Sequence, residues 1–134
     1  MAKLSDIEGI GAAYSAKLEA IGITSMEQLL DNCCTKKGRV DTAAKSGVSE
    51  KLILGWVNRA DMTRIKGVST QYADLLKMAG VDTVPELAQR KAANLAAKMA
   101  EVNAEKNLVR KVPSEKDVEK WVAQAKELPR VITH

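Results

Sequence analysis

Two short turns in this sequence contain the residue types that can bind a phosphate group. The first is Gly9-Ile10-Gly11 and the second is Gly67-Val68-Ser69, and helix-forming residues follow both. Glycine allows the backbone to approach an anion closely, and the first N–H groups of a helix have no acceptor within it. Because these N–H groups lie at the positive end of the helix dipole, the residues leave two interpretations open: each turn binds a phosphate, or it only joins two packed helices.

Cationic side chains near the turns could neutralise a phosphate. The net charge of +4 is unevenly distributed, because residues 33–66 carry eight Lys or Arg against three acids, whereas residues 1–32 carry two against five. No aromatic residues alternate with these cations, which argues against stacking on single-stranded bases. A solvated polar face is the alternative interpretation. The candidate nucleic-acid-binding cations are Lys36, Lys37, Arg39, Lys45, Arg59, Arg64 and Lys66.

The residue types needed for catalysis do not occur in a useful pattern. The single histidine is His134, and the adjacent Cys33 and Cys34 are expected to be reduced thiols, since a disulfide between neighbours is strained. No nucleophile is paired with a base, and no phosphate loop of the GxxxxGK[ST] type or metal-ligand spacing is present. We therefore expect no catalytic residue, no metal, no cofactor and no enzyme activity.

The two turns occupy equivalent places in an internal repeat. Residues 7–30 align with residues 65–88 at a shift of 58 positions. In each copy we expect a helix after the turn, over 12–21 and 70–79, which a glycine ends. The identical pairs are Ile7 and Ile65, Gly9 and Gly67, Tyr14 and Tyr72, Leu18 and Leu76, Gly22 and Gly80, and Leu29 and Leu87.

A further helix in each copy has its own start signal. Thr24 with Glu27, and Thr83 with Glu86, match the capping box in which the first side chain accepts from the backbone N–H three residues on. Outside the repeat, other polar residues precede helix-forming segments. Further N-caps are expected at Ser49, Asn103 and Ser114.

These patterns predict an all-α fold with two halves, 1–60 and 61–134. Each half is a bundle of about five short helices, too small to be stable alone, so the halves should share one core. Aromatic residues make up only 3% of the chain, so the core must be aliphatic, with Trp56 and Trp121 as its largest side chains. Tyr14 and Tyr72 are expected to pack on this core. Residues 97–106 fit either a partner-binding helix or a helix that packs on its own core.

Residues 4–30, with the Gly-Ile-Gly turn and "GITSMEQL", resemble the helix-hairpin-helix motif, and residues 65–87 resemble a second copy. Two such motifs look like the tandem helix-hairpin-helix domain of DNA repair and recombination proteins. The whole chain is similar to an uncharacterised bacterial family, a domain of unknown function in the helix-hairpin-helix group. The resemblance implies that both hairpins bind phosphates of double-stranded DNA across one minor groove, without base specificity.

The sequence departs from the helix-hairpin-helix pattern at several positions. DNA-binding members often carry Lys or Arg two residues past the hairpin, where this chain has Ala13 and Gln71, and Ser69 replaces a glycine in the second copy. Glu8 would repel a phosphate from the first turn, whereas Lys66 occupies the equivalent place in the second. The second turn is therefore the better candidate for a phosphate site.

Two functions remain open from the sequence. The first is a nucleic-acid-binding module that contacts backbone phosphates, and the second is a protein-interaction adaptor whose hairpins only join packed helices. No run of about 18 apolar residues is present, and the N-terminus does not resemble a signal peptide. We therefore expect a cytoplasmic protein with no membrane partner.

Overall fold

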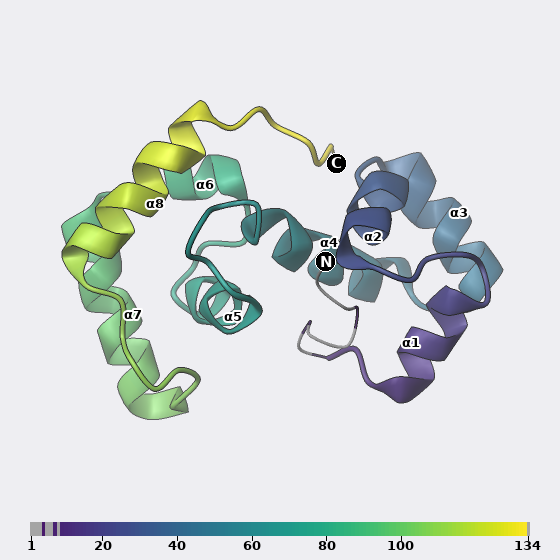
Figure 1. Ribbon diagram of the computed structural model, residues 1–134, viewed down its shortest axis with the longest axis horizontal. Helices are drawn as coiled ribbons and strands as arrows, with labels where there is room; N and C mark the ends of the chain where they lie inside the picture. The colour runs from purple at the N-terminus through teal and green to yellow at the C-terminus, as the bar shows by residue number, and fades with distance from the viewer. Residues whose placement is uncertain (1–3, 5–6, 8, 134) are drawn as a thin grey trace. The chain divides into compact units, whose positions relative to one another are not determined.

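A computed structural model describes residues 4, 7 and 9–133. The described residues form α-helices and no strands, which confirms the all-α fold class. The helices are α1 (Ala12–Glu19), α2 (Met26–Cys33), α3 (Lys36–Ser46), α4 (Glu50–Met62), α5 (Thr70–Met78), α6 (Val84–Ala88), α7 (Ala92–Lys106) and α8 (Glu115–Glu127) (Figure 1).

The chain divides into two units. Unit 1 comprises Met1–Asp61 and Val131–His134, and unit 2 comprises Met62–Arg130. The sequence boundary was expected after residue 60, and the second half was expected to continue to residue 134. Instead, the segment that follows unit 2 returns to unit 1, where Ile132 is buried and the N–H of Thr133 donates to the carbonyl of Cys34 at 2.8 Å.

The core of unit 1 is aliphatic around one tryptophan. Trp56 of α4 is 2% exposed, and the ring of Tyr14 packs against its indole edge-on, with ring centroids 5.2 Å apart. Leu18 of α1 and Leu29 of α2 are fully buried in the same cluster. Trp56 is therefore a core residue, as expected.

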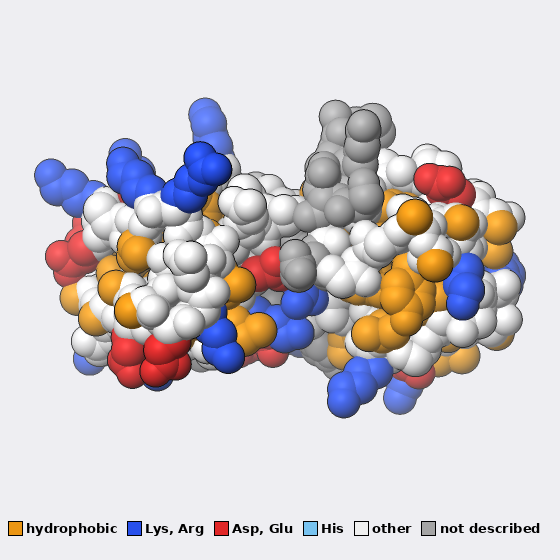
Figure 2. All heavy atoms as spheres, turned by 90° about the horizontal axis from the view of Figure 1, so that it is seen from below, with side chains coloured by type: hydrophobic (Ala, Val, Ile, Leu, Met, Phe, Trp, Pro, Cys, Tyr) orange, Lys and Arg blue, Asp and Glu red, His pale blue; other side chains and the backbone are white. Residues whose placement is uncertain are grey.

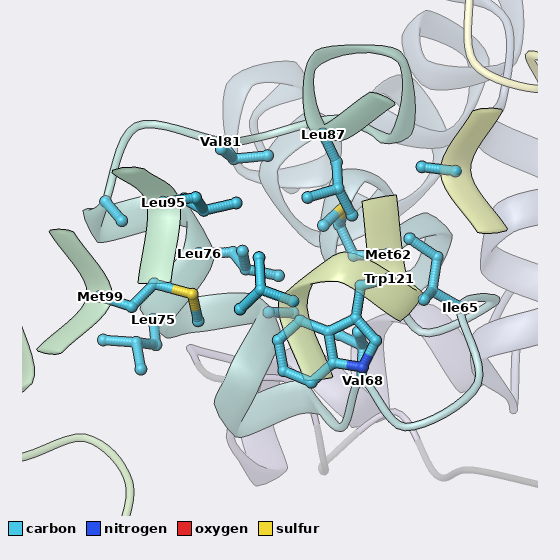
Figure 3. Close-up of a cluster of buried hydrophobic side chains, with 14 of the residues drawn as sticks. Met62, Ile65, Val68, Leu75, Leu76, Val81, Leu87, Leu95, Met99 and Trp121 are labelled. Atoms are coloured by element: carbon cyan, nitrogen blue, oxygen red, sulfur yellow. The ribbon is translucent and has the colours of Figure 1, made fainter. Parts of the chain in front are cut away.

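The core of unit 2 is likewise aliphatic around one tryptophan. Figure 3 shows Trp121 of α8 beside Val68, with Leu75 and Leu76 of α5 and Met99 of α7 in the same cluster. Trp121 is 5% exposed and is also a core residue. Each buried cluster is confined to one unit, and the expected sharing of one core between the halves stays a prediction.

The N-cap expected at Thr24 is wrong by one residue. Ser25 has the extended backbone of an N-cap, and its hydroxyl accepts from the N–H of Gln28 at 3.2 Å. The N–H and hydroxyl of Thr24 instead donate to the side-chain oxygen of Gln28. The expected cap at Thr83 is confirmed, since its hydroxyl accepts from the N–H of Glu86. A shift of 58 residues pairs Ser25, not Thr24, with Thr83.

The expected N-cap at Asn103 is also wrong. Asn103 lies within α7 and is 9% exposed, because the helix-forming residues of 92–106 continue through it. Its amide donates to the carbonyl of Val109 and accepts from the N–H of the same residue, both at 3.0 Å. The caps at Ser49 and Ser114 are confirmed. Since Leu95, Met99 and Asn103 are the buried residues of α7, this helix packs on its own core.

Candidate nucleic-acid interface

The second turn is held in place by α8. The backbone of Gly67 has φ = +96°, and a Cβ atom there would lie 3.0 Å from the indole nitrogen of Trp121. The side-chain amide of Gln124 donates to the carbonyl of Lys66 at 3.2 Å, and its oxygen accepts from the N–H of Lys66 at 2.9 Å. Val68 is buried, so the turn presents the backbone of Gly67 and Ser69 to solvent.

The start of α5 carries N–H groups with no acceptor. Ser69 is the N-cap, and its hydroxyl accepts from the N–H of Tyr72 at 3.3 Å. The preceding N–H groups of Ser69, Thr70 and Gln71 donate to no atom of the described residues. These three donors lie at the positive end of the α5 dipole, which is the arrangement that attracts an anion.

The cations nearest to the second turn in sequence differ in their surroundings. Lys66 directly precedes the turn and its side chain is exposed. Arg64 is half-buried, and its Nη2 donates to the carbonyl of Pro129 at 3.2 Å. Arg59 is half-buried as well, and its Nη1 donates to the carbonyl of Gly55 at 3.3 Å. Lys66 is therefore the most accessible of the three cations.

The first turn has a similar geometry with less charge. Gly9 has φ = +92°, and a Cβ atom there would lie 3.5 Å from the indole nitrogen of Trp56. Ile10 is buried, and the exposed Gly11 is an N-cap that provides no side-chain hydrogen bond to α1. The N–H groups at the start of α1 have no acceptor among the residues that the structure describes. Glu8, expected to repel a phosphate, lies outside the described residues.

The tyrosines pack on the tryptophans beneath both turns. The ring centroids of Tyr72 and Trp121 are 5.4 Å apart, close to the 5.2 Å between Tyr14 and Trp56. Both tyrosines are half-buried, and the hydroxyl of Tyr72 donates to the carbonyl of Lys111 at 2.8 Å. The expected packing of both tyrosines on the core is confirmed.

Arg39 does not have the surroundings of a phosphate-binding residue. It is 2% exposed, and its Nη1 donates to the carbonyls of Cys33 and Cys34 at 3.1 and 3.2 Å. Its Nη2 donates to the carbonyl of Thr133 at 2.7 Å. The expectation that Arg39 faces a phosphate is therefore wrong, because its guanidinium is buried against backbone carbonyls of unit 1.

The three candidate lysines near Arg39 in sequence are exposed. Lys36, Lys37 and Lys45 lie on α3 in unit 1, whereas the second turn belongs to unit 2. A single surface that contains both the α3 lysines and the second turn stays a prediction.

Sequence reasoning missed two cations beside the second turn. A cavity of about 470 Å³ is lined by Gln71 and Tyr72 of α5 and by residues 107–111, which include the exposed Arg110 and Lys111. Figure 2 shows several Lys and Arg side chains projecting along one edge of unit 2 (upper left). The available signal was the insertion near residue 110, since the first copy of the repeat has no counterpart to this loop.

Two thiols lie next to each other at the C-terminal end of α2. Cys33 and Cys34 are free, and the buried Cys33 thiol donates to the hydroxyl of Thr42 at 3.3 Å. Burial raises the pKa of the Cys33 thiol. The described residues contain no group of three or more His, Cys, Asp or Glu side chains placed to bind a metal. Within the same residues, no helix has the length and hydropathy needed to cross a membrane.

Comparison with known proteins identifies the family. The chain belongs to the family described as a domain of unknown function (DUF4332), whose sequence model matches residues 8–128. No curated protein and no solved structure matches the chain. The expectation of an uncharacterised family, a domain of unknown function, is therefore confirmed, whereas its bacterial origin and its place in the helix-hairpin-helix group stay predictions.

Proposed function

We propose that this chain is a non-catalytic tandem helix-hairpin-helix module that binds backbone phosphates of double-stranded DNA without sequence specificity. The observation that carries the proposal is the set of three N–H groups at the start of α5 that have no acceptor among the described residues, close in sequence to the exposed Lys66. Such donors, together with an adjacent cation, suit a phosphate and carry no base information.

The helix-hairpin-helix assignment is supported by contacts that recur in both units. Each turn has a glycine with positive φ above a tryptophan, at Gly9 over Trp56 and at Gly67 over Trp121. In each unit a tyrosine from the following helix packs on the same indole. These shared contacts, which join residues distant in sequence, favour two pseudo-symmetric copies of one structural motif.

The second hairpin contributes more binding energy than the first in this proposal. The first turn lies in the acidic part of the chain, since residues 1–32 carry five acids against two Lys or Arg. The second turn combines Lys66 with the free N–H groups of α5. Because counterion release scales with the number of phosphates neutralised, most of the affinity arises in unit 2.

The test is titration of a fluorescently labelled duplex at two salt concentrations, followed by anisotropy. Backbone binding predicts that log K falls linearly with log salt, with a slope of about −0.9 for each phosphate contacted. Duplexes of unrelated sequence should bind equally well, since the contacts proposed are with phosphates only. Failure to bind any duplex at low salt would contradict the proposal.

The protein-interaction adaptor is the second candidate function. Three large apolar side chains of the described residues are exposed, Val40 (45%), Leu52 (41%) and Met78 (50%). Individual exposed apolar side chains are common on soluble domains, whereas a binding site for a protein needs a contiguous patch. Val40 and Leu52 belong to unit 1 and Met78 belongs to unit 2, so the proposal of DNA binding rests on the hairpin geometry and not on the apolar surface.

A further inference from the structure

The cavity beside the second turn is lined by a loop that the first copy of the repeat lacks. One wall is the first turn of α5, with Gln71 and Tyr72, and the other is the inserted loop of residues 107–111. We propose that this cavity binds a phosphomonoester, with Arg110 and Lys111 as its cationic ligands. The inference rests on the proposed function, because both use the first turn of α5.

The charges around the cavity favour a strongly anionic ligand. Arg110 is exposed, and its guanidinium has no acceptor among the described residues. The pKa of the Asp117 carboxyl is lowered chiefly by its hydrogen bonds with Ser114, including the one from the N–H of Ser114 at 3.2 Å, and to a smaller extent by the charge of Lys111. The planar guanidinium of Arg110 can donate two parallel hydrogen bonds to a phosphate.

The loop that carries these cations is held by three hydrogen bonds to its backbone. The hydroxyl of Tyr72 donates to the carbonyl of Lys111, and the amide of Asn103 makes two hydrogen bonds to the backbone of Val109. Asn107 ends α7 with φ = +51°, a conformation that asparagine tolerates better than most residues. Since the backbone on both sides of Arg110 is held, a ligand meets an ordered loop, and only the exposed side chains of Arg110 and Lys111 have to adjust to it.

The number of donors distinguishes a phosphomonoester from a backbone phosphate. A phosphodiester carries a single negative charge, whereas a phosphomonoester carries about −1.5 to −2 near neutral pH and has three terminal oxygens. The two positive charges of Arg110 and Lys111 match the second group better than the first. The phosphate at the end of a nucleic-acid strand and that of a small phosphorylated compound share this chemistry.

The first arm of the test compares two duplexes that differ only in a 5′-phosphate or a 5′-hydroxyl. We expect the phosphorylated duplex to bind about tenfold more tightly, and this preference should disappear in Arg110→Gln/Lys111→Gln. The matched control Lys77→Gln/Lys126→Gln removes two exposed charges of unit 2 that lie outside the cavity lining and should retain the preference.

The second arm is an NMR titration of the wild-type chain with inorganic phosphate. Shifts of the Gln71 and Arg110 amides, without any preference between the duplexes, would assign the cavity to a small phosphorylated compound. If there is no preference between the duplexes and these amides do not shift, the inference is overturned. Salt-dependent binding of the 5′-hydroxyl duplex would still support the proposed function in that case. If the wild-type chain does not bind the 5′-hydroxyl duplex but its Gln71 and Arg110 amides shift with phosphate, the proposed function is contradicted. The assignment of the cavity is then supported by the phosphate shifts.

Discussion

The indole nitrogen of Trp121 lies 3.0 Å from the point that a Cβ atom at Gly67 would occupy. Two features favour glycine here: its φ of +96° disfavours any side chain, and the indole beneath it would have to shift by a few tenths of an ångström to admit one. Trp121 is buried in the core of unit 2, so the position of the turn is fixed relative to the hydrophobic core. A phosphate bound at this turn would meet a backbone that needs little rearrangement.

Gly67→Ala should destabilise the protein more than Gly80→Ala. Both glycines have positive φ, so both substitutions should cost about 1 kcal/mol of backbone strain. At Gly80 the nearest atom is Arg90 Nη1 at 3.6 Å, an ordinary contact, whereas at Gly67 the alanine would crowd the indole and cost about 1 kcal/mol more. Urea unfolding measures the difference, and equal losses would show that Trp121 moves aside freely.

Lys66→Glu should weaken duplex binding more than Lys17→Glu. Both lysines are exposed, but Lys66 precedes the turn before α5, whereas Lys17 lies in the last turn of α1 with its ammonium 5.7 Å from the ring centre of Tyr14. The Lys66 variant should also bind with a shallower salt dependence, since one phosphate contact is lost. Anisotropy titrations provide both quantities, and equal effects would mean that the second turn is not the binding site.

Arg39→Lys should lower the free energy of unfolding by about 1–3 kcal/mol, although the charge is kept. Lysine cannot reproduce the guanidinium that donates to the carbonyls of Cys33, Cys34 and Thr133, and these acceptors would lose partners in a buried site. The control is Lys37→Gln on the exposed surface of α3, which should change stability little. A stable Arg39→Lys variant would argue against the buried role.

Asn103→Ala should destabilise the chain and loosen the loop that carries Arg110. The substitution removes both hydrogen bonds to Val109 from a buried site, at a cost of about 1–3 kcal/mol. Amide hydrogen exchange of Val109 should become faster. Asn94→Ala is the matched control, because Asn94 is exposed on the same helix, and unchanged exchange at Val109 in the Asn103 variant would refute the proposed anchoring.

Iodoacetamide should modify Cys34 before Cys33 in the folded protein. Burial raises the pKa of the Cys33 thiol above its ordinary value of 9.0, so at pH 8 its reactive thiolate is scarcer than in an exposed cysteine. Cys34 is half-buried and more accessible to the reagent. Mass spectrometry of partly labelled protein gives the order of reaction, which should vanish in guanidinium chloride. Faster labelling of Cys33 under native conditions would contradict the structure.

The helices that follow the turns could be predicted because their signals are local. The helices after Gly11 and Ser69 begin where expected, and Gly22 and Gly80 follow their ends with positive φ. The cap of α2 was placed one residue early because Thr24 and Ser25 are adjacent hydroxyl residues and either can begin a capping pattern. The choice between them depends on the backbone conformation at the helix start, which the sequence does not determine.

The candidate site was less predictable because it depends on contacts between distant residues. Arg39 has the sequence context of an exposed cation, and only its contact with Thr133, 94 residues away, shows that it is buried. Arg110 and Lys111 lie far in sequence from the second turn, and the hydrogen bond from Tyr72 places their loop beside it. Neither relationship has a periodicity or motif that could reveal it.

The return of residues 131–133 to unit 1 determines the order in which the protein can mature during translation. The chain leaves unit 1 after Asp61 and re-enters it at Val131, so the whole of unit 2 must emerge from the ribosome first. Until then the site of Ile132 is unfilled, and Arg39 lacks its acceptor on Thr133. Multidomain chains usually fold in N-terminal order. Here the unit that is begun first is completed second, because one residue of its buried cluster, Ile132, is synthesised after the whole of unit 2.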